Sequence, residues 1–73
     1  MNIRYCIATR IIYLRNYHNL TQAALAKKAK VCQSTIAQIE NERKTPSLEV
    51  LWKLCAVFKI SLEDFFGMTW VSE

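Results

Sequence analysis

The stretch LTQAALAKKAKVCQSTIAQIEN, from Leu20 to Asn41, decides the fold, because its pattern predicts two short helices joined by a tight turn. The first half places Leu25 on an apolar face, and the second half repeats Ile36 and Ile39 at helical spacing. The side chains pointing away from that stripe are amides, a hydroxyl and a methyl, on Gln33, Ser34, Ala37 and Gln38. A polar, nearly uncharged helix face suits base edges in the major groove, which predicts a DNA-binding protein.

Charge is distributed unevenly along the chain. The net charge is +4 at pH 7. Residues 1–39 hold six Arg or Lys residues and no carboxylate, whereas residues 40–73 hold four Arg or Lys residues and six carboxylates. A solvated charged face is common in helical domains, but here the basic half contains most of the predicted helix pair. We therefore expect that half to meet DNA phosphates.

Length and composition limit the class of protein. A chain of 73 residues predicts one domain with a small core. Hydrophobic residues make up 52% of it, so we expect some apolar surface to face a partner. No apolar run approaches the ~18 residues of a membrane span, and the N-terminal segment lacks a signal-peptide cleavage site. These features predict a cytoplasmic protein that does not use a membrane.

The cysteines and the single histidine argue against metal and catalytic sites. Cys6, Cys32 and Cys55 are widely spaced and form no C-x-x-C pair, which disfavours a zinc site and a secreted disulfide framework. Cys6 and Cys55 are best explained as small core residues. Nothing pairs His18 with a nucleophile or a metal. We expect no enzyme activity, no metal and no cofactor.

Five helices and no strands are predicted, so the expected fold class is all-α. The helices should cover about residues 2–17, 21–30, 33–41, 47–58 and 61–67. Thr21, Ser47 and Ser61 are the expected N-caps, and Asn19 is an expected left-handed stop. The predicted inner stripe of the first helix is Ile3, Ile7, Ile11 and Leu14. The predicted apolar side of the fourth helix is Leu48, Leu51, Trp52, Cys55 and Phe58.

Five short motifs follow one another between residues 7 and 66. They are I-A-x-R-I-x-x-L-R, L-T-Q-x-x-L-A, Q-S-T-I-x-Q-I-E-N, T-P-S-L-x-x-L and I-S-L-E-D-F-F. Together they resemble the lambda-repressor-like (XRE) helix-turn-helix proteins. The resemblance implies a five-helix DNA-binding domain over residues 1–67, with the second and third helices as the helix-turn-helix. It also implies an ion pair between Arg15 and Glu40, and a buried Phe65.

The chain departs from the family pattern at several turns. Lys30, Glu42 and Lys59 stand where relatives usually have glycine, and Cys32 replaces the usual serine cap of the recognition helix. A non-glycine residue in a left-handed conformation costs on the order of 1 kcal/mol. These changes affect the expected turn geometry but not the fold class.

The resemblance implies base contacts by residues matching Gln33, Ser34 and Gln38. Glutamine can bond adenine N6 and N7 together, so the two glutamines are the leading candidates. The alternative is that these side chains are only soluble surface. Ala37 either packs on a thymine methyl or is simply a good helix former.

Phosphate contacts are expected on both sides of the recognition helix. Thr21 and Gln22 open the second helix, where backbone amides favour an anion, and the resemblance implies that Gln22 also buttresses the first recognition residue. For Arg43 and Lys44 the alternative is a solvated charge. The remaining phosphate candidates are Asn41, Thr45 and, more weakly, Arg10.

The C-terminal end is rich in apolar residues. We expect residues 68–73 to form a tail that contributes to a twofold dimer interface. The alternative is a tail folded over its own core. The expected interface residues are Phe66, Met68, Trp70 and Val71.

These observations predict a sequence-specific transcription regulator, of repressor or controller type, that binds a palindromic operator in double-stranded DNA as a homodimer. One alternative is an antitoxin that represses its operon and holds a protein toxin with its aromatic C-terminus. The other is a protein-interaction module that does not bind DNA. The carboxylate-free N-terminal half and the pair Gln33 and Gln38 argue against the latter.

Overall fold

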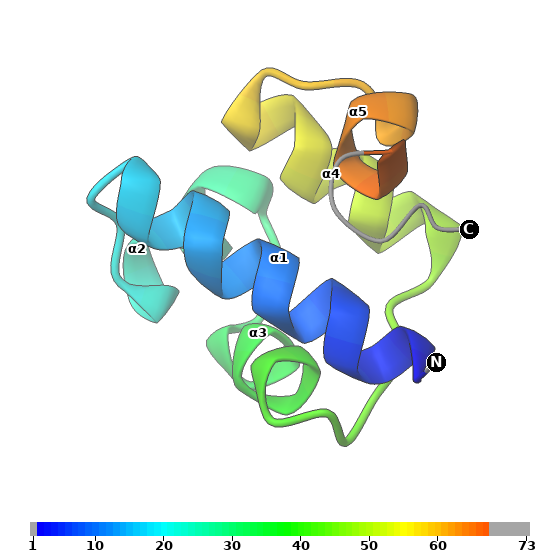
Figure 1. Cartoon of the computed structure of the whole chain (residues 1–73). Coiled ribbons are helices and arrows are strands. Elements are labelled where there is room, and N and C mark those ends of the chain that lie inside the picture. The colour runs from blue at the N-terminus through cyan, green and yellow to red at the C-terminus, as the bar shows by residue number, and fades with distance from the viewer. Residues whose placement is uncertain (1, 68–73) are drawn as a thin grey trace.

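A computed structural model describes residues 2–67 of the chain. The helices are α1 (Ile3–Tyr17), α2 (Gln22–Ala29), α3 (Gln33–Glu40), α4 (Leu48–Phe58) and α5 (Leu62–Gly67), and the described residues contain no strand. In Figure 1, α1 crosses the middle of the molecule, with α3 on one side of it and α4 and α5 on the other. The predicted all-α, five-helix class is confirmed.

Side-chain caps explain where most of the helices begin. The Thr21 hydroxyl accepts a hydrogen bond from the amide of Ala24, and the Ser47 hydroxyl accepts one from the amide of Val50. At the start of α1 the side-chain oxygen of Asn2 accepts a hydrogen bond from the amide of Arg4. At the start of α5 the Ser61 hydroxyl accepts one from the amide of Asp64. Each bond satisfies an amide that has no partner within the first turn. Cys32 precedes α3 without any side-chain cap bond.

Within residues 2–67, four non-glycine residues adopt the left-handed conformation, with φ between 57° and 63°. Asn19 follows α1, as expected from the sequence, and its short polar side chain tolerates this region. The other three follow α2, α3 and α4, at the positions where the family usually has glycine, and they are Lys30, Glu42 and Lys59. The turns thus keep the backbone shape that glycine favours, at a cost of about 1 kcal/mol each.

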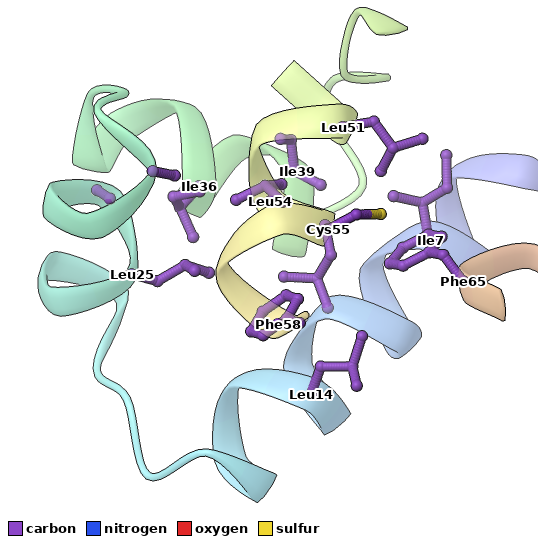
Figure 2. Close-up of a cluster of buried hydrophobic side chains, with 13 residues drawn as sticks. Ile7, Leu14, Leu25, Ile36, Ile39, Leu51, Leu54, Cys55, Phe58 and Phe65 are labelled. Carbon is purple, nitrogen blue, oxygen red and sulfur yellow. The ribbon is translucent and has the colours of Figure 1, made fainter. Parts of the chain in front are cut away.

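The core lies where α1, α2, α3 and α4 meet, and α5 closes it (Figure 2). Leu25, Ile36, Ile39, Leu54 and Phe65 are completely buried in it. The buried positions of Cys6 and Cys55 match their predicted place in the core, and burial raises the pKa of the Cys55 thiol.

Three side chains predicted to face the core are exposed instead. Ile3, Leu48 and Trp52 are 53%, 70% and 63% exposed. In α4 the side chain of Leu54 is buried, although the predicted apolar stripe omitted it. With Leu54 facing the core, α4 is rotated so that Leu48 and Trp52 lie on its solvent-facing side. No helix among residues 2–67 has both the length and the apolarity needed to cross a membrane.

Candidate nucleic-acid interface

The segment between α2 and α3 is a tight turn set by backbone geometry. Lys30 ends α2 in the left-handed conformation, and the Val31 amide then donates to the carbonyl oxygen of Ala26 at 3.0 Å. Val31 itself packs against the core cluster. The chain leaves this turn through Cys32 and enters α3, and α3 packs against α2 and α1. This is the helix-turn-helix arrangement that the sequence predicted.

The two faces of α3 have opposite chemistry. Ile36 and Ile39 are completely buried and hold the helix against the core. The residues of the other face are exposed, or partly exposed in the case of Ala37, and they are Gln33, Ser34, Ala37 and Gln38. The structure therefore brings all four expected base-contact residues to one surface. That surface offers amide, hydroxyl and methyl groups and no charge, which suits base edges.

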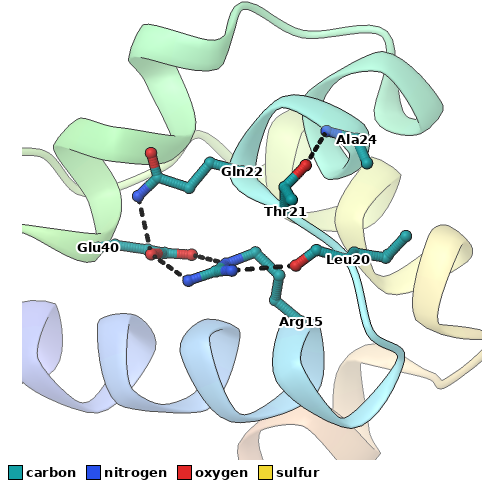
Figure 3. Close-up of polar contacts among 6 residues, drawn as sticks. All are labelled: Arg15, Leu20, Thr21, Gln22, Ala24 and Glu40. Atoms are coloured by element: carbon teal, nitrogen blue, oxygen red, sulfur yellow. Dashed lines mark hydrogen bonds and ion pairs between the residues drawn. The ribbon is translucent and has the colours of Figure 1, made fainter.

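A hydrogen-bonded network behind α3 fixes its C-terminal end (Figure 3). Arg15 Nε donates to Glu40 Oε2 at 2.7 Å, and Arg15 Nη2 donates to Glu40 Oε1 at 3.1 Å. Gln22 Nε2 also donates to Glu40 Oε1, at 3.0 Å, and Arg15 Nη1 donates to the carbonyl oxygen of Leu20. The Glu40 side chain is only 5% exposed. Bidentate pairing and a third donor satisfy this nearly buried carboxylate.

The same network links three segments that are distant in sequence. Arg15 belongs to α1, Gln22 to the first turn of α2 and Glu40 to the last turn of α3. Tying them together holds α3 at one angle to α2, which a helix must keep if its outer side chains are to meet bases in register. Gln22, expected at a phosphate, has one amide N–H engaged with Glu40 and keeps a second N–H.

The loop after α3 carries most of the expected phosphate-contacting residues. The Arg43 amide donates to the carbonyl oxygen of Gln38 at 2.9 Å, so the loop starts directly from the helix end. The loop residues expected at phosphates are all exposed, and they are Asn41, Arg43, Lys44 and Thr45. At the other end of the surface, the hydroxyl of Thr21 is used in capping α2.

Arg4 belongs to this surface and was not among the predicted site residues. Its Nε donates to Thr45 Oγ1 at 3.1 Å, which joins the start of α1 to the loop after α3. The two residues are 41 positions apart, so no local pattern in the sequence indicates the contact. The uneven charge of residues 1–39 was the only available signal, and it did not single out Arg4.

The placement of Arg10 argues against its expected phosphate contact. The residue is 5% exposed, and its guanidinium lies 5.5 Å from the centre of the Tyr13 ring. The sequence prediction gave Arg10 as a weaker phosphate candidate. The helix instead turns this side chain inward beside Tyr13, where it is shielded from a phosphate backbone.

The expected dimer residues fall mostly beyond the described part of the chain. Phe66 is half-buried, and its ring meets the Phe65 ring edge-on, with centroids 5.1 Å apart. Phe65 is completely buried, as the resemblance implied. Met68, Trp70 and Val71 lie outside the described residues.

Comparison with known proteins gives matches to one family. The helix-turn-helix family model (HTH_3) matches residues 11–65. An HTH-type transcriptional regulator from Methanocaldococcus jannaschii is 42% identical over 57 residues, covering 78% of this chain and 86% of that protein. The immunity repressor of Bacillus phage phi105 is 34% identical over 61 residues, covering 84% and 42%.

The crystal structure of another protein has a similar fold. An HTH_3 family transcriptional regulator from Vibrio cholerae aligns with a TM-score of 0.81 and 28% identity, covering 88% of this chain and 36% of that one. Three observations indicate a helix-turn-helix protein: the family model, the relative from Methanocaldococcus jannaschii, and the buried and exposed faces of α3. The chain therefore belongs to the helix-turn-helix family and is a DNA-binding transcription regulator rather than an enzyme.

Proposed function

We propose that the chain binds a palindromic operator as a homodimer and represses transcription from the promoter that the operator overlaps. The observation that supports this most is the outer face of α3, on which Gln33, Ser34 and Gln38 are exposed together above a fully buried Ile36 and Ile39. Gln33 and Gln38 would read adenines through N6 and N7, and Ala37 would approach a thymine methyl.

Phosphate contacts on either side would position this helix without reading sequence. The first turn of α2, with Thr21 and Gln22, would hold one phosphate through backbone amides and the second N–H of the Gln22 amide. The loop after α3 would follow the backbone through Asn41, Arg43, Lys44 and Thr45. The bond to Thr45 places Arg4 beside that loop, so we add Arg4 to this set.

Homodimer formation is supported by the amount of apolar surface that the domain leaves uncovered. Apart from Trp52, five large apolar side chains of the described residues are more than half exposed, and they are Ile3, Tyr5, Tyr13, Tyr17 and Leu48. Phe66 and the tail residues Met68, Trp70 and Val71 would add to a twofold interface. Such a dimer would set its two α3 helices about 34 Å apart, one turn of the duplex.

A repressor role is supported by the similarity to the phi105 immunity repressor, and it would operate by occlusion of the promoter. A regulator that binds chromosomal DNA in this way would work in the cytoplasm. An antitoxin would share the same DNA surface, and its toxin would be an additional partner.

The test is selection of bound duplexes from a randomised DNA pool by the full chain at near-physiological salt, because salt sets how much non-specific binding survives. The proposal predicts enrichment of a palindrome whose half-sites lie about one helical turn apart. An enriched single half-site would contradict the homodimer. A pool that shows no enrichment would contradict sequence-specific binding.

A further inference from the structure

A surface depression of about 520 Å³ lies between the C-terminal end of α2 and the outer side of α4. Its lining consists of an apolar part, which we call the floor and which includes Trp52, Val57 and two alanine side chains, and of four lysines, which we call the rim. The rim residues are Lys28, Lys30, Lys53 and Lys59. We call this feature the lysine groove.

The positive charge of the lysine groove is largely uncompensated. Among the described residues no carboxylate lines it, and Lys53 forms an ion pair with Glu49 at 3.5 Å, one turn earlier in α4. Over residues 2–67, none of the other three lysines lies within 4.0 Å of a carboxylate. Like charges held this close around one depression attract an acidic partner and repel a basic one.

The apolar floor distinguishes this surface from a simple phosphate-binding patch. Trp52 is 63% exposed, although a tryptophan of this size ordinarily covers apolar surface in a core or an interface. A phosphate backbone would use the lysines and leave the indole without a contact. A peptide that carries acidic residues beside an apolar side chain would use both. Tryptophan is among the residues on which binding energy concentrates in protein interfaces.

The lysine groove also lies apart from the DNA-reading surface. Thr21 and Gln22 are at the N-terminal end of α2, whereas Lys28 and Lys30 are at its other end. An eight-residue helix is about 12 Å long, so the groove and the expected phosphate site are separated by that length. Figure 1 shows α4 on the opposite side of α1 from α3. A partner in the groove would leave the outer face of α3 available to DNA.

We propose that the lysine groove is a docking site for an acidic segment of a partner protein, one with a leucine or aromatic side chain between Asp or Glu residues. The apolar side chain would cover Trp52 and Val57, and the carboxylates would lie against Lys28, Lys30 and Lys59. This site would bring a second protein to the regulator while DNA is bound. The proposal goes beyond DNA binding and does not depend on it.

The first experiment is selection from a phage-displayed library of random 12-residue peptides, using the full chain as target. We expect the enriched peptides to share an apolar residue flanked by Asp or Glu. The best of them, labelled with a fluorophore, is then titrated against the wild-type chain and three variants, Lys28→Glu, Trp52→Ala and Lys27→Glu. Lys27 is the matched control, because it is exposed, neighbours Lys28 on α2 and does not line the groove.

The expected result is a loss of affinity of about tenfold or more in Lys28→Glu and Trp52→Ala, a change of less than about twofold in Lys27→Glu, and weaker binding as salt rises. Lys30→Gly provides a further variant that removes a rim charge at a left-handed position where glycine is favoured, so the fold is retained. The proposal is wrong if the enriched peptides lack acidic residues, if no peptide is enriched, or if Lys27→Glu weakens binding as much as Lys28→Glu.

A parallel titration with a 20-base-pair duplex separates this site from a DNA surface. The proposal predicts that Trp52→Ala leaves duplex affinity unchanged. If Lys28→Glu and Trp52→Ala both weaken duplex binding by the same factor as peptide binding, the groove binds nucleic acid and the protein-docking proposal fails.

Discussion

Glu40 is a nearly buried acid that the network behind α3 holds in place. Its side chain is 5% exposed, and its carboxylate accepts hydrogen bonds from both Arg15 and Gln22. Glu40→Ala would leave the Arg15 guanidinium, 16% exposed, without its acid, and we expect a loss of about 3 kcal/mol of unfolding free energy. Glu42→Ala is the matched control, because Glu42 is exposed, and we expect a change within about 0.5 kcal/mol. Urea unfolding measures both, and equal losses would contradict this account of the network.

The three thiols should differ sharply in reactivity. Cys32 is exposed at the start of α3, whereas Cys6 and Cys55 are buried, and burial raises the pKa of the Cys55 thiol. A raised pKa leaves less thiolate at a given pH, and burial blocks the reagent as well. At pH 8 we expect one thiol per chain to react rapidly with a disulfide reagent and the other two only as the protein opens. Cys32→Ser should remove the fast phase. Rapid reaction of two or three thiols would show that the core is not closed as described.

Residues that follow the helices adopt a strained backbone conformation, and a glycine substitution should relieve that strain. Lys59 follows α4 with φ of 61°, a conformation that costs a non-glycine residue about 1 kcal/mol. We expect Lys59→Gly to raise the unfolding free energy by up to about 1 kcal/mol, which raises the melting temperature by several degrees in a domain of this size. Ala56→Gly, within the same helix, should lower the unfolding free energy by a similar amount. Destabilisation by Lys59→Gly would mean that the lysine side chain contributes more than its backbone costs.

Much of the arrangement of helices was predictable from the sequence. Caps at Thr21, Ser47 and Ser61 and the stripe through Ile36 and Ile39 are local features, so the element order and the orientation of α3 follow from residues close together in the chain. The left-handed turn at Lys30 came from comparison with a family pattern, because lysine itself gives no indication of it.

The positions that were not predictable depend on tertiary packing. The stripe pattern of α4 is wide enough to fit two helix rotations, and only packing against α1 and α2 decides that Leu54 is buried and Trp52 exposed. The inward turn of Arg10 and the bond from Arg4 to Thr45 are likewise long-range outcomes. As a result, the base-reading candidates could be identified from sequence, whereas the membership of Arg4 in the surface and the lysine groove could not.

Taken as a whole, the molecule separates its chemistry by face. The exposed amides of α3 and the cations of the loop that follows it belong to one end of the chain's helix-turn-helix, whereas the lysine groove lies between the C-terminal end of α2 and α4. This separation predicts that changes on α3 alter which sequence is bound, whereas changes in the loop alter how tightly any duplex is bound.

The most direct test compares Gln38→Ala with Lys44→Ala on the selected duplex and on a scrambled duplex of equal length, across a range of salt concentrations. We expect Gln38→Ala to weaken binding to the selected duplex by about 1–3 kcal/mol and to leave binding to the scrambled duplex unchanged. Lys44→Ala should weaken binding to both duplexes alike and reduce the salt dependence by about one counterion. Equal weakening of both duplexes by Gln38→Ala would show that the outer face of α3 does not read the bases.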